Sequence, residues 1–294
     1  MTLLSDNCPV CESPETFERY PDELGGNDPT VDYHFTPQTR KTYRIAEFTE
    51  CTHQFVSPLP AVAHLYETNV DATYLQSLVQ RAKSAEAWLQ IVLKYSPNIP
   101  THYSLLDVGC ATGIFLNCAA RHMRVEGIEL SEWAADIASR RHHVHRHTLA
   151  LLNSSQKFNI ITLWGVIEHM ENPKSEIRLA KAHLVKDGLL FVYTGDRSAS
   201  LPRILGKRWW WYQGMHIQYF TKSSLSSLLV SEGFEIVGTQ RLPMFFSFHS
   251  LGQSLNRYKL ASPFVKLLQR FPKNRIFLRL RLSGEMLLVA RKCH

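Results

Sequence analysis

Hydrophobic and polar positions along most of the chain follow two alternating patterns. Between residues 73 and 96, apolar residues recur every three or four positions, which predicts one or two amphipathic helices. Short apolar runs follow, and a segment of helical periodicity comes after most of them. The runs that we expect to be strands are 104–110, 124–130, 157–169, 189–196, 234–240 and 285–292. Strands and helices that alternate over more than 200 residues predict an α/β fold with a doubly wound, Rossmann-like, parallel sheet.

The helices expected between these strands carry recognisable end signals. Ser131 precedes one helical segment as an N-cap, and Gly233 closes another. The segments themselves are 113–123, 131–141, 174–185 and 223–233.

Residues 1–60 differ from the rest of the chain. Long periodic segments are missing there, turn-forming Pro and Gly residues are frequent, and one alternating segment at 42–48 predicts a strand. The sequence SPLP at 57–60 interrupts the chain. We therefore expect a small N-terminal module over 1–60 and a main domain over 61–294.

Composition places the chain among globular proteins. It has 294 residues, of which 45% are hydrophobic, so a substantial core can be buried. The first residues show no basic segment followed by an apolar one, and no stretch approaches the roughly 18 apolar residues of a spanning helix. We expect a soluble, cytoplasmic protein with reduced cysteines.

Charge is distributed unevenly. Residues 1–60 hold ten acidic and four basic side chains, a net charge of −6. Because the whole chain has a net charge of +7, residues 61–294 carry +13. In 255–294, ten Lys and Arg residues accompany a single acid, Glu285. Such a segment can attract nucleic acid, anionic lipid or a phosphorylated substrate, or it can be a solvated surface. Both interpretations stay open.

A glycine turn follows the first expected strand of the sheet. LLDVGCATG places Gly109 and Gly113 at its carboxyl end, where open α/β sheets bind ligands. The next strand ends at Glu129, 22 residues after Asp107, and a carboxylate there can accept both hydrogen bonds of a ribose diol. A turn followed by an acid predicts a nucleoside site.

The dinucleotide fingerprint does not fit this turn. The pattern G-x-G-x-x-G would need glycine at 109, 111 and 114, but the chain has Ala111 and Ile114. A pyrophosphate-binding turn is therefore not expected.

These motifs together resemble a known family. DVGCATG, Glu129, FNIITLWGVIEHMENP and the turn KDGLLFV are similar to the successive motifs of class I S-adenosylmethionine-dependent methyltransferases. Within that superfamily they resemble the small-molecule branch that includes ubiquinone-biosynthesis-type O-methyltransferases. The resemblance runs from about residue 62 to the C-terminus and implies a seven-stranded sheet and S-adenosylmethionine as cofactor.

The resemblance also assigns cofactor-binding residues. Glu129 would hold the ribose hydroxyls, Leu130 would pack on the adenine, and Thr148 stands where relatives carry an acid for the adenine edge. Ala111 replaces the usual central glycine, and Asn159 stands where an aspartate is usual. The full predicted set is Asp107, Gly109, Cys110, Gly113, Glu129, Leu130, Thr148, Leu149 and Trp164.

Two histidines are candidates for the chemistry. Similar sequences have a histidine where His216 stands, followed by an aromatic pair and a capping Thr, and a general base with a pKa near neutrality would assist transfer to a hydroxyl. His169 is expected to border the cofactor pocket. The ubiquinone-type enzymes carry an additional Glu where Gly165 stands, so a divalent cation at Glu168-His169 is not expected.

Other notable groups have weaker functional interpretations. The run Trp209–Tyr212, beside Lys207 and Arg208, could stack a sugar or base, although a hydrophobic lid is the favoured interpretation. Histidines at 142, 143, 145 and 147 are expected at a sheet edge or on the surface, because odd and even strand positions face opposite sides.

The N-terminal module carries a possible metal site. Cys8 and Cys11 form a C-x-x-C knuckle of the kind that holds tetrahedral zinc, and Cys51 and His53 could supply the remaining ligands. The module resembles the two-knuckle zinc ribbons of many small-molecule methyltransferases, including the ending FVSPLP at 55–60. One cysteine of that pattern is absent, so His53 or His34 would have to replace it. The alternative is a vestigial ribbon with cysteines in its core.

The leading hypothesis is a methyltransferase for a small molecule, such as a sugar or a secondary-metabolite intermediate. RNA methylation is a second hypothesis, disfavoured by the acidic residues 1–60, and a non-catalytic S-adenosylmethionine-binding protein is a third. Peripheral membrane contact is a further possibility. Apolar residues at helical spacing support it, but docking onto the sheet explains them as well: Phe264, Leu267, Leu268 and Phe271.

Overall fold

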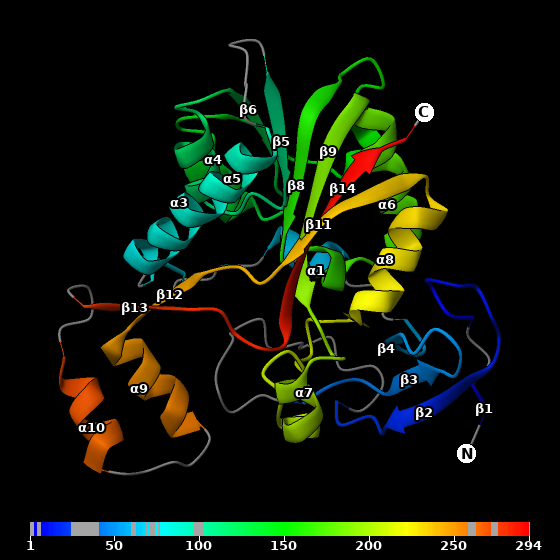
Figure 1. Cartoon of the computed structure of the whole chain (residues 1–294), viewed down its shortest axis with the longest axis vertical. Coiled ribbons are helices and arrows are strands. Elements are labelled where there is room, and N and C mark those ends of the chain that lie inside the picture. The colour runs from blue at the N-terminus through cyan, green and yellow to red at the C-terminus, as the bar shows by residue number, and fades with distance from the viewer. Residues whose placement is uncertain are drawn as a thin grey trace.

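A computed structural model of the chain contains a central sheet with helices on both faces (Figure 1). The structure describes residues 3–4, 7–24, 41–59, 63–68, 70, 74–75, 77–96, 103–257, 263–271 and 276–293. Seven strands form the sheet in the order β11-β14-β9-β8-β5-β6-β7, which confirms the predicted α/β fold. Their bounds are β5 Ser104–Val108, β6 Arg124–Ile128, β7 His143–His145, β8 Phe158–Trp164, β9 Leu184–Gly195, β11 Phe234–Gln240 and β14 Glu285–Lys292.

The sheet is mixed rather than parallel throughout. β5 pairs in parallel with β6 and β8, and β7 and β9 extend the parallel part on either side. β14 runs antiparallel to both of its neighbours, β9 and β11. A parallel strand requires a crossover connection, and no helix packed across the sheet joins β11 to β14 in the described part of the chain. The expectation of a wholly parallel sheet was therefore wrong at its last strand.

Two helical layers cover the sheet. Consecutive residues of β5 face opposite layers, because side chains alternate along a strand: Leu105 packs with Leu89 of α3, and Leu106 packs in the cluster that contains Ile177 of α6. The hydroxyl of Ser131 accepts a hydrogen bond from Ala134 N, as its predicted role as an N-cap requires. The helices are α3 Leu78–Tyr95, α4 Ile114–Ala119, α5 Glu132–Ala138, α6 Pro173–His183 and α8 Lys222–Ser231.

The N-terminal module is joined to the main domain through a shared sheet. Five antiparallel strands run in the order β1-β2-β3-β4-β10, and the last of them comes from the main domain. Gln218 of β10 lies opposite Phe55 of β4. A boundary at residue 60 therefore divides the chain but not the sheet. The strands are β1 Leu3–Leu4, β2 Thr16–Tyr20, β3 Ile45–Phe48, β4 Gln54–Val56 and β10 Gln218–Tyr219.

Short elements lie between this module and the sheet or follow the sheet strands. Figure 1 shows α1 and α7 on the side of the sheet that faces the module. They are α1 Ala63–Glu67 and α7 Ser200–Leu205, with single 3-10 turns η1 Leu149–Leu151, η2 Ile167–His169 and η3 Gly206–Arg208.

Residues 241–284 form an excursion between β11 and β14, which we call the arm. β12 Met244–Ser247 pairs with β13 Phe277–Leu280, and between them lie α9 Phe248–Arg257 and α10 Pro263–Arg270. The two helices pack on each other, with the rings of Phe248 and Phe271 5.2 Å apart. Figure 1 shows this hairpin projecting away from the sheet. Leu268 is buried beside Gly252 of α9, so docking onto the sheet does not explain the apolar spacing. No described helix is long and apolar enough to cross a membrane.

Candidate active site

The turn after β5 is held in a conformation that requires glycine. The N–H groups of Gly109 and Cys110 both donate to the carbonyl of Ile128, at 2.8 and 3.0 Å. Gly109 has φ +71° and Gly113 has φ +77°, in the left-handed region that L side chains rarely adopt. A Cβ on Gly109 would lie 2.6 Å from a methyl group of Val166. The close packing of Val166 and the left-handed backbone therefore both require glycine at 109.

Glu129 fastens this turn to the next helix. One carboxylate oxygen accepts from the backbone N–H of Ala111 at 2.8 Å, and the other accepts from Ser131 N–H at 2.8 Å. Burial raises the pKa of this carboxyl group. Ala111 has φ +47°, a strained angle for a residue with a side chain. The structure thus brings Gly109, Gly113 and Glu129 together at the carboxyl ends of β5 and β6.

Asp107 and Cys110 lie beneath the turn rather than at its surface. Asp107 is 2% exposed and accepts a hydrogen bond from the Thr162 hydroxyl at 2.6 Å, and burial raises its pKa to about 7. A Cβ on Gly127 would lie 2.5 Å from the sulfur of Cys110, so that thiol fills the core beneath β6. The backbone of Cys110 therefore lies in the turn, whereas its side chain points into the core.

The predicted adenine segment lies beside Glu129. Glu129 N–H donates to the carbonyl of His145 at 3.0 Å, which places the ends of β6 and β7 side by side. Leu130 is half-buried, Thr148 is exposed, and Leu149 is buried in the core. Leu130 and Thr148 are therefore the residues of this segment that a ligand can reach.

Trp164, at the end of β8, belongs to an aromatic cluster. Its ring lies 5.2 Å from that of Trp88 in α3 and 5.0 Å from that of Phe115 in α4. Its indole nitrogen is buried without a hydrogen-bond partner among the described residues. This arrangement fits a wall of the cleft more than a polar contact.

Tyr74 is a residue that sequence reasoning missed. Burial raises the pKa of its hydroxyl, and the carboxylates of Asp107 and Glu129 are near enough to contribute. The guanidinium of Arg81 lies 3.9 Å from the centre of its ring. Tyr74 stands in no motif, so only the folded chain reveals that it adjoins the glycine turn.

A second group of polar residues gathers after β8. Ligand atoms of Glu168, His169 and His216 all lie within 4.8 Å of one another. The rings of His169 and His216 are 4.7 Å apart. Glu168 is 1% exposed and accepts from the Thr194 hydroxyl at 2.9 Å. Both predicted catalytic histidines therefore meet at one place.

The two histidines differ in how many of their ring nitrogens take part in hydrogen bonds. Nδ1–H of His216 donates to the carbonyl of Trp211 at 2.7 Å, and its Nε2 accepts from the amide of Gln213 at 2.8 Å. Nδ1–H of His169 donates to the carbonyl of Met215 at 2.8 Å, with the Tyr66 hydroxyl also 2.8 Å away. No hydrogen bond from a described residue engages Nε2 of His169. Of the four ring nitrogens of the two histidines, this is the one without a hydrogen-bond partner among the described residues.

Burial removes charge from this group at neutral pH. It lowers the pKa of His169 to about 4 and raises the pKa of Glu168 to about 8. Burial, and then the neighbouring His169, holds the pKa of His216 well below its usual range. Both imidazoles are therefore neutral and Glu168 is protonated.

The aromatic run is a packed core beneath the N-terminal module. Trp209 is 0% exposed and stacks against Trp211 with ring centres 6.0 Å apart. Tyr212 is buried and donates from its hydroxyl to the side-chain carbonyl of Gln54. Trp209 and Trp211 pack against Gly195 of β9, and Tyr212 reaches β4, so the prediction of a stacking surface was wrong for these three buried rings. The lid stays a prediction.

Three cysteines of the module converge, but His53 does not join them. The sulfur of Cys51 lies 3.6 Å from that of Cys8 and 3.3 Å from that of Cys11. His53 is fully buried, with Nε2 2.9 Å from the side-chain oxygen of Gln218 and its ring 4.6 Å from that of Phe220. His34 falls outside the described residues.

The histidine-rich segment lies at the edge of the sheet, where it was expected. His143 and His145 share one face of β7, and Nε2 of His145 lies 2.9 Å from a carboxylate oxygen of Glu126. His142 instead contacts Asn117.

The mixed seven-stranded sheet, the glycine turn after β5 and the acid after β6 define a nucleoside-binding α/β domain of the methyltransferase type. The methyltransferase-domain family model matches residues 79–239, more than half of the chain. The chain belongs to this family.

Curated relatives are ubiquinone biosynthesis O-methyltransferases. That of Glaesserella parasuis is 33% identical over 111 residues, which cover 32% of this chain and 46% of the relative. That of Coxiella burnetii is 31% identical over 115 residues, covering 35% of this chain and 48% of the relative. The chain thus spans about half the length of the curated relatives it matches.

Solved structures share the fold. A SAM-dependent methyltransferase from Archaeoglobus fulgidus has a TM-score of 0.51 at 15% identity and covers 76% of this chain and all (100%) of that one. Magnesium protoporphyrin IX methyltransferase from Synechocystis, with bound SAH, has a TM-score of 0.50 at 13% identity, covering 78% of this chain and 92% of that one. At these identities the likeness concerns the fold alone.

The buried carboxyls predict a fall in stability above pH 6.5. Burial raises the pKa of Glu168 to about 8 and those of Asp107 and Glu285 to about 7. The folded state then holds protons that the unfolded chain has released, so the free energy of unfolding falls as pH rises from 6.5 to 8. The slope is up to about 1.4 kcal/mol per pH unit for each group. Buried histidines oppose this trend only below pH 6.5.

Urea unfolding of Glu168→Gln at several pH values checks this prediction. The variant should lose part of the slope between pH 6.5 and 8, whereas Glu132→Gln, at an exposed position of α5, should keep all of it. An unchanged slope in Glu168→Gln would show that this carboxyl is ionised in the folded state.

Proposed function

We propose that the chain is an S-adenosylmethionine-dependent methyltransferase that acts on a small molecule. The observation that carries the proposal is the carboxylate of Glu129, which accepts a hydrogen bond from Ala111 N–H within the left-handed glycine turn after β5. This geometry supports a ribose diol on Glu129 with the methionine portion along the turn. Leu130 and Thr148 would border the adenine, with Trp164 nearby as an apolar wall.

Binding of S-adenosylhomocysteine tests the ribose assignment. We expect Glu129→Ala to weaken binding about 10- to 100-fold, because hydrogen bonds to a charged acceptor contribute about 1.5–3 kcal/mol each. Glu129→Gln keeps one side-chain oxygen that can accept from the turn, so it should reduce the affinity for S-adenosylhomocysteine less than Glu129→Ala does. Calorimetric titration measures each affinity, with Glu132→Ala as the control for charge. Equal affinity in Glu129→Ala and the control would refute the assignment.

We further propose that His169 is the general base and His216 its positioning residue. When bound, S-adenosylmethionine supplies an electrophilic methyl group to the acceptor. Nε2 of His169 takes up the proton that an acceptor hydroxyl releases, while Nδ1–H stays held by the carbonyl of Met215. His216 has both nitrogens engaged and packs against His169, so it orients the loop at 211–216. An oxygen acceptor follows from this arrangement.

The two histidine variants separate these roles. His169→Gln should lower kcat about 10- to 100-fold with an unchanged affinity for S-adenosylhomocysteine. An imidazole whose pKa is about 4 is a weak base, so its contribution lies at or below the lower end of the usual factor of about 10²–10⁴ in rate. His216→Gln should lower kcat less than about tenfold and mainly reduce the free energy of unfolding, by about 1–3 kcal/mol. Methyl transfer to a catechol from labelled S-adenosylmethionine gives kcat, and urea unfolding gives stability. The opposite ranking of the two kcat values would overturn the assignment.

We also propose that the three cysteines of the module hold a structural zinc ion. Tetrahedral zinc with bonds of about 2.3 Å separates its sulfurs by about 3.8 Å, and the sulfur of Cys51 lies 3.6 Å from that of Cys8 and 3.3 Å from that of Cys11, near that value. His53 is held by Gln218, so the fourth position falls to water or to another ligand. The ion would tie the loop at 8–11 to the turn before β4.

Metal analysis of the purified chain tests this site. We expect one zinc per chain, lost in Cys11→Ser, whereas Cys293→Ser, at another exposed thiol, should retain it. Zinc below stoichiometry in the wild type, even after purification with added metal, would favour cysteines that serve only in packing.

A further inference from the structure

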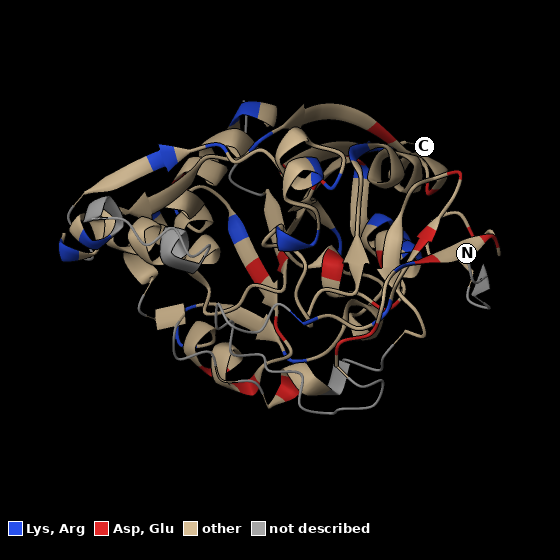
Figure 2. Ribbon diagram, turned by 90° about the horizontal axis from the view of Figure 1, so that it is seen from below, with Lys and Arg blue, Asp and Glu red and all other residues tan. Residues whose placement is uncertain are grey.

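The arm is strongly and uniformly basic. Residues 241–284 contain nine Lys and Arg residues and no Asp or Glu. Five of these cations are described with exposed side chains, and none of the five pairs with a described carboxylate: Arg241, Lys266, Arg270, Arg279 and Arg281. In Figure 2 the arm lies at the left of the view, where its ribbon shows blue Lys and Arg residues and no red Asp or Glu residues. The arm therefore carries an uncompensated positive field.

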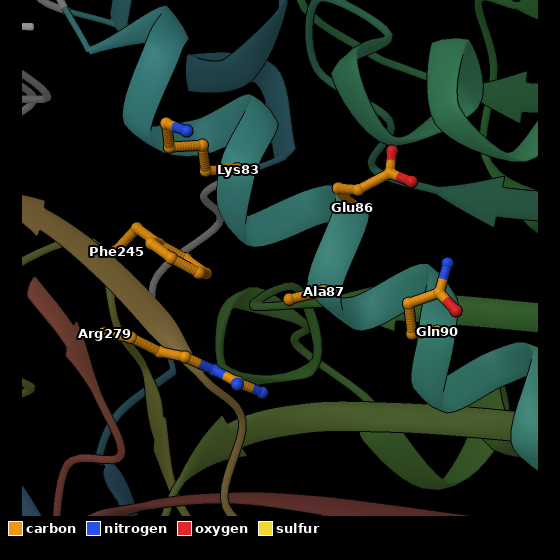
Figure 3. Close-up of a pocket in the computed structure, with 6 residues that line it drawn as sticks. All are labelled: Lys83, Glu86, Ala87, Gln90, Phe245 and Arg279. Atoms are coloured by element: carbon orange, nitrogen blue, oxygen red, sulfur yellow. The ribbon is translucent and has the colours of Figure 1, made fainter. Parts of the chain in front are cut away.

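A groove lies at the root of the arm. It encloses about 380 Å³ between one face of α3 and the β12–β13 ladder. Figure 3 shows Phe245 and Arg279 of the arm across the groove from Ala87 of α3, with the ammonium of Lys83 turned away from Arg279. Glu86, the one acid among the lining residues, is paired with Arg121. Lys83 lies 5.2 Å from the ring centre of Phe277, so it adds a cation to the face where the arm meets α3.

Aliphatic side chains are exposed beside these cations. On the arm, Leu267 is 53% and Ile276 is 45% exposed. On the first turn of α3, Leu78 and Val79 are 39% and 41% exposed. This turn contacts the arm directly, since Ser250 of α9 donates to the side-chain oxygen of Gln80 at 3.1 Å. Exposed aliphatic residues and cations thus occur together on the arm and at its junction with α3.

This combination favours a lipid surface over a nucleic acid. Cations attract either polyanion, but leucine, isoleucine and valine gain free energy by entering the boundary between headgroups and acyl chains. Proteins bind nucleic acids through aromatic stacking and polar contacts instead.

We propose that the arm docks the protein on an anionic phospholipid membrane through its exposed cations and the aliphatic side chains beside them. The docking goes beyond methyl transfer and does not depend on it. Each exposed cation near an anionic surface strengthens binding about fivefold, and an inserted leucine side chain adds about tenfold.

Sedimentation with vesicles tests the docking, using the full chain without S-adenosylmethionine. The wild type should sediment with vesicles of phosphatidylcholine and phosphatidylserine, and not with phosphatidylcholine alone. The triple variant Lys266→Gln/Arg270→Gln/Arg279→Gln should bind about 100-fold more weakly, and Leu267→Gln about tenfold. The matched control Arg140→Gln/Arg141→Gln/Lys186→Gln removes the same charge outside the arm and should bind like the wild type.

Three outcomes would overturn the proposal. They are failure of the wild type to sediment with anionic vesicles, equal loss in the triple variant and its control, and tight binding of oligouridylate through the arm without vesicle binding. All substituted side chains are exposed, so circular dichroism melting should be unchanged and a folding defect can be recognised. Because no methyl transfer is measured, failure of the proposed enzymatic function would leave this result intact.

Discussion

The carboxylate of Glu129 joins the two parts of the cofactor cleft. Its two oxygens accept from Ala111 on one side and from Ser131 on the other, so the turn after β5 and the start of α5 have a common anchor. Hydrogen bonds to Glu129 and to the carbonyl of Ile128 fix the backbone of this turn, in which Ala111 has a strained φ and the glycines are left-handed. A ribose diol would exchange with or share these hydrogen bonds, which couples ligand binding to the shape of the turn.

The N-terminal module supports the other half of the site. β10 completes the module's sheet, and the residues just before it include His216. Arg197 of the main domain reaches Glu47 of β3, and Gln218 reaches His53, so the backbone that orients His216 is held from both sides. A metal at the cysteines would stiffen this support from the far end of the same sheet. The module thus shares a sheet and side-chain contacts with the segment that follows His216.

Local patterns in the sequence foretold the elements but not their partners. The sheet strands, the cap at Ser131 and the pairing of glycine turn with Glu129 follow from periodicity and spacing, which are properties of neighbouring residues. Contacts between distant segments determine three other features, and no local pattern predicts them. These features are the antiparallel direction of β14, the pairing of β10 with the N-terminal sheet, and the burial of the Cys110 thiol in the core. The burial of Trp209 was missed for the same reason, since it packs beside Gly195 of β9 and Gly284 before β14. Tyr74 carried no signal at all.

A crystal structure with S-adenosylhomocysteine tests the central claim most directly. The account predicts both ribose hydroxyls within hydrogen-bond distance of Glu129, the methionine portion along the backbone from Gly109 to Gly113, and the sulfur on the side of the cleft that holds Nε2 of His169. A ribose bound away from Glu129, or a sulfur separated from His169 by the aromatic cluster of Trp164, would contradict it.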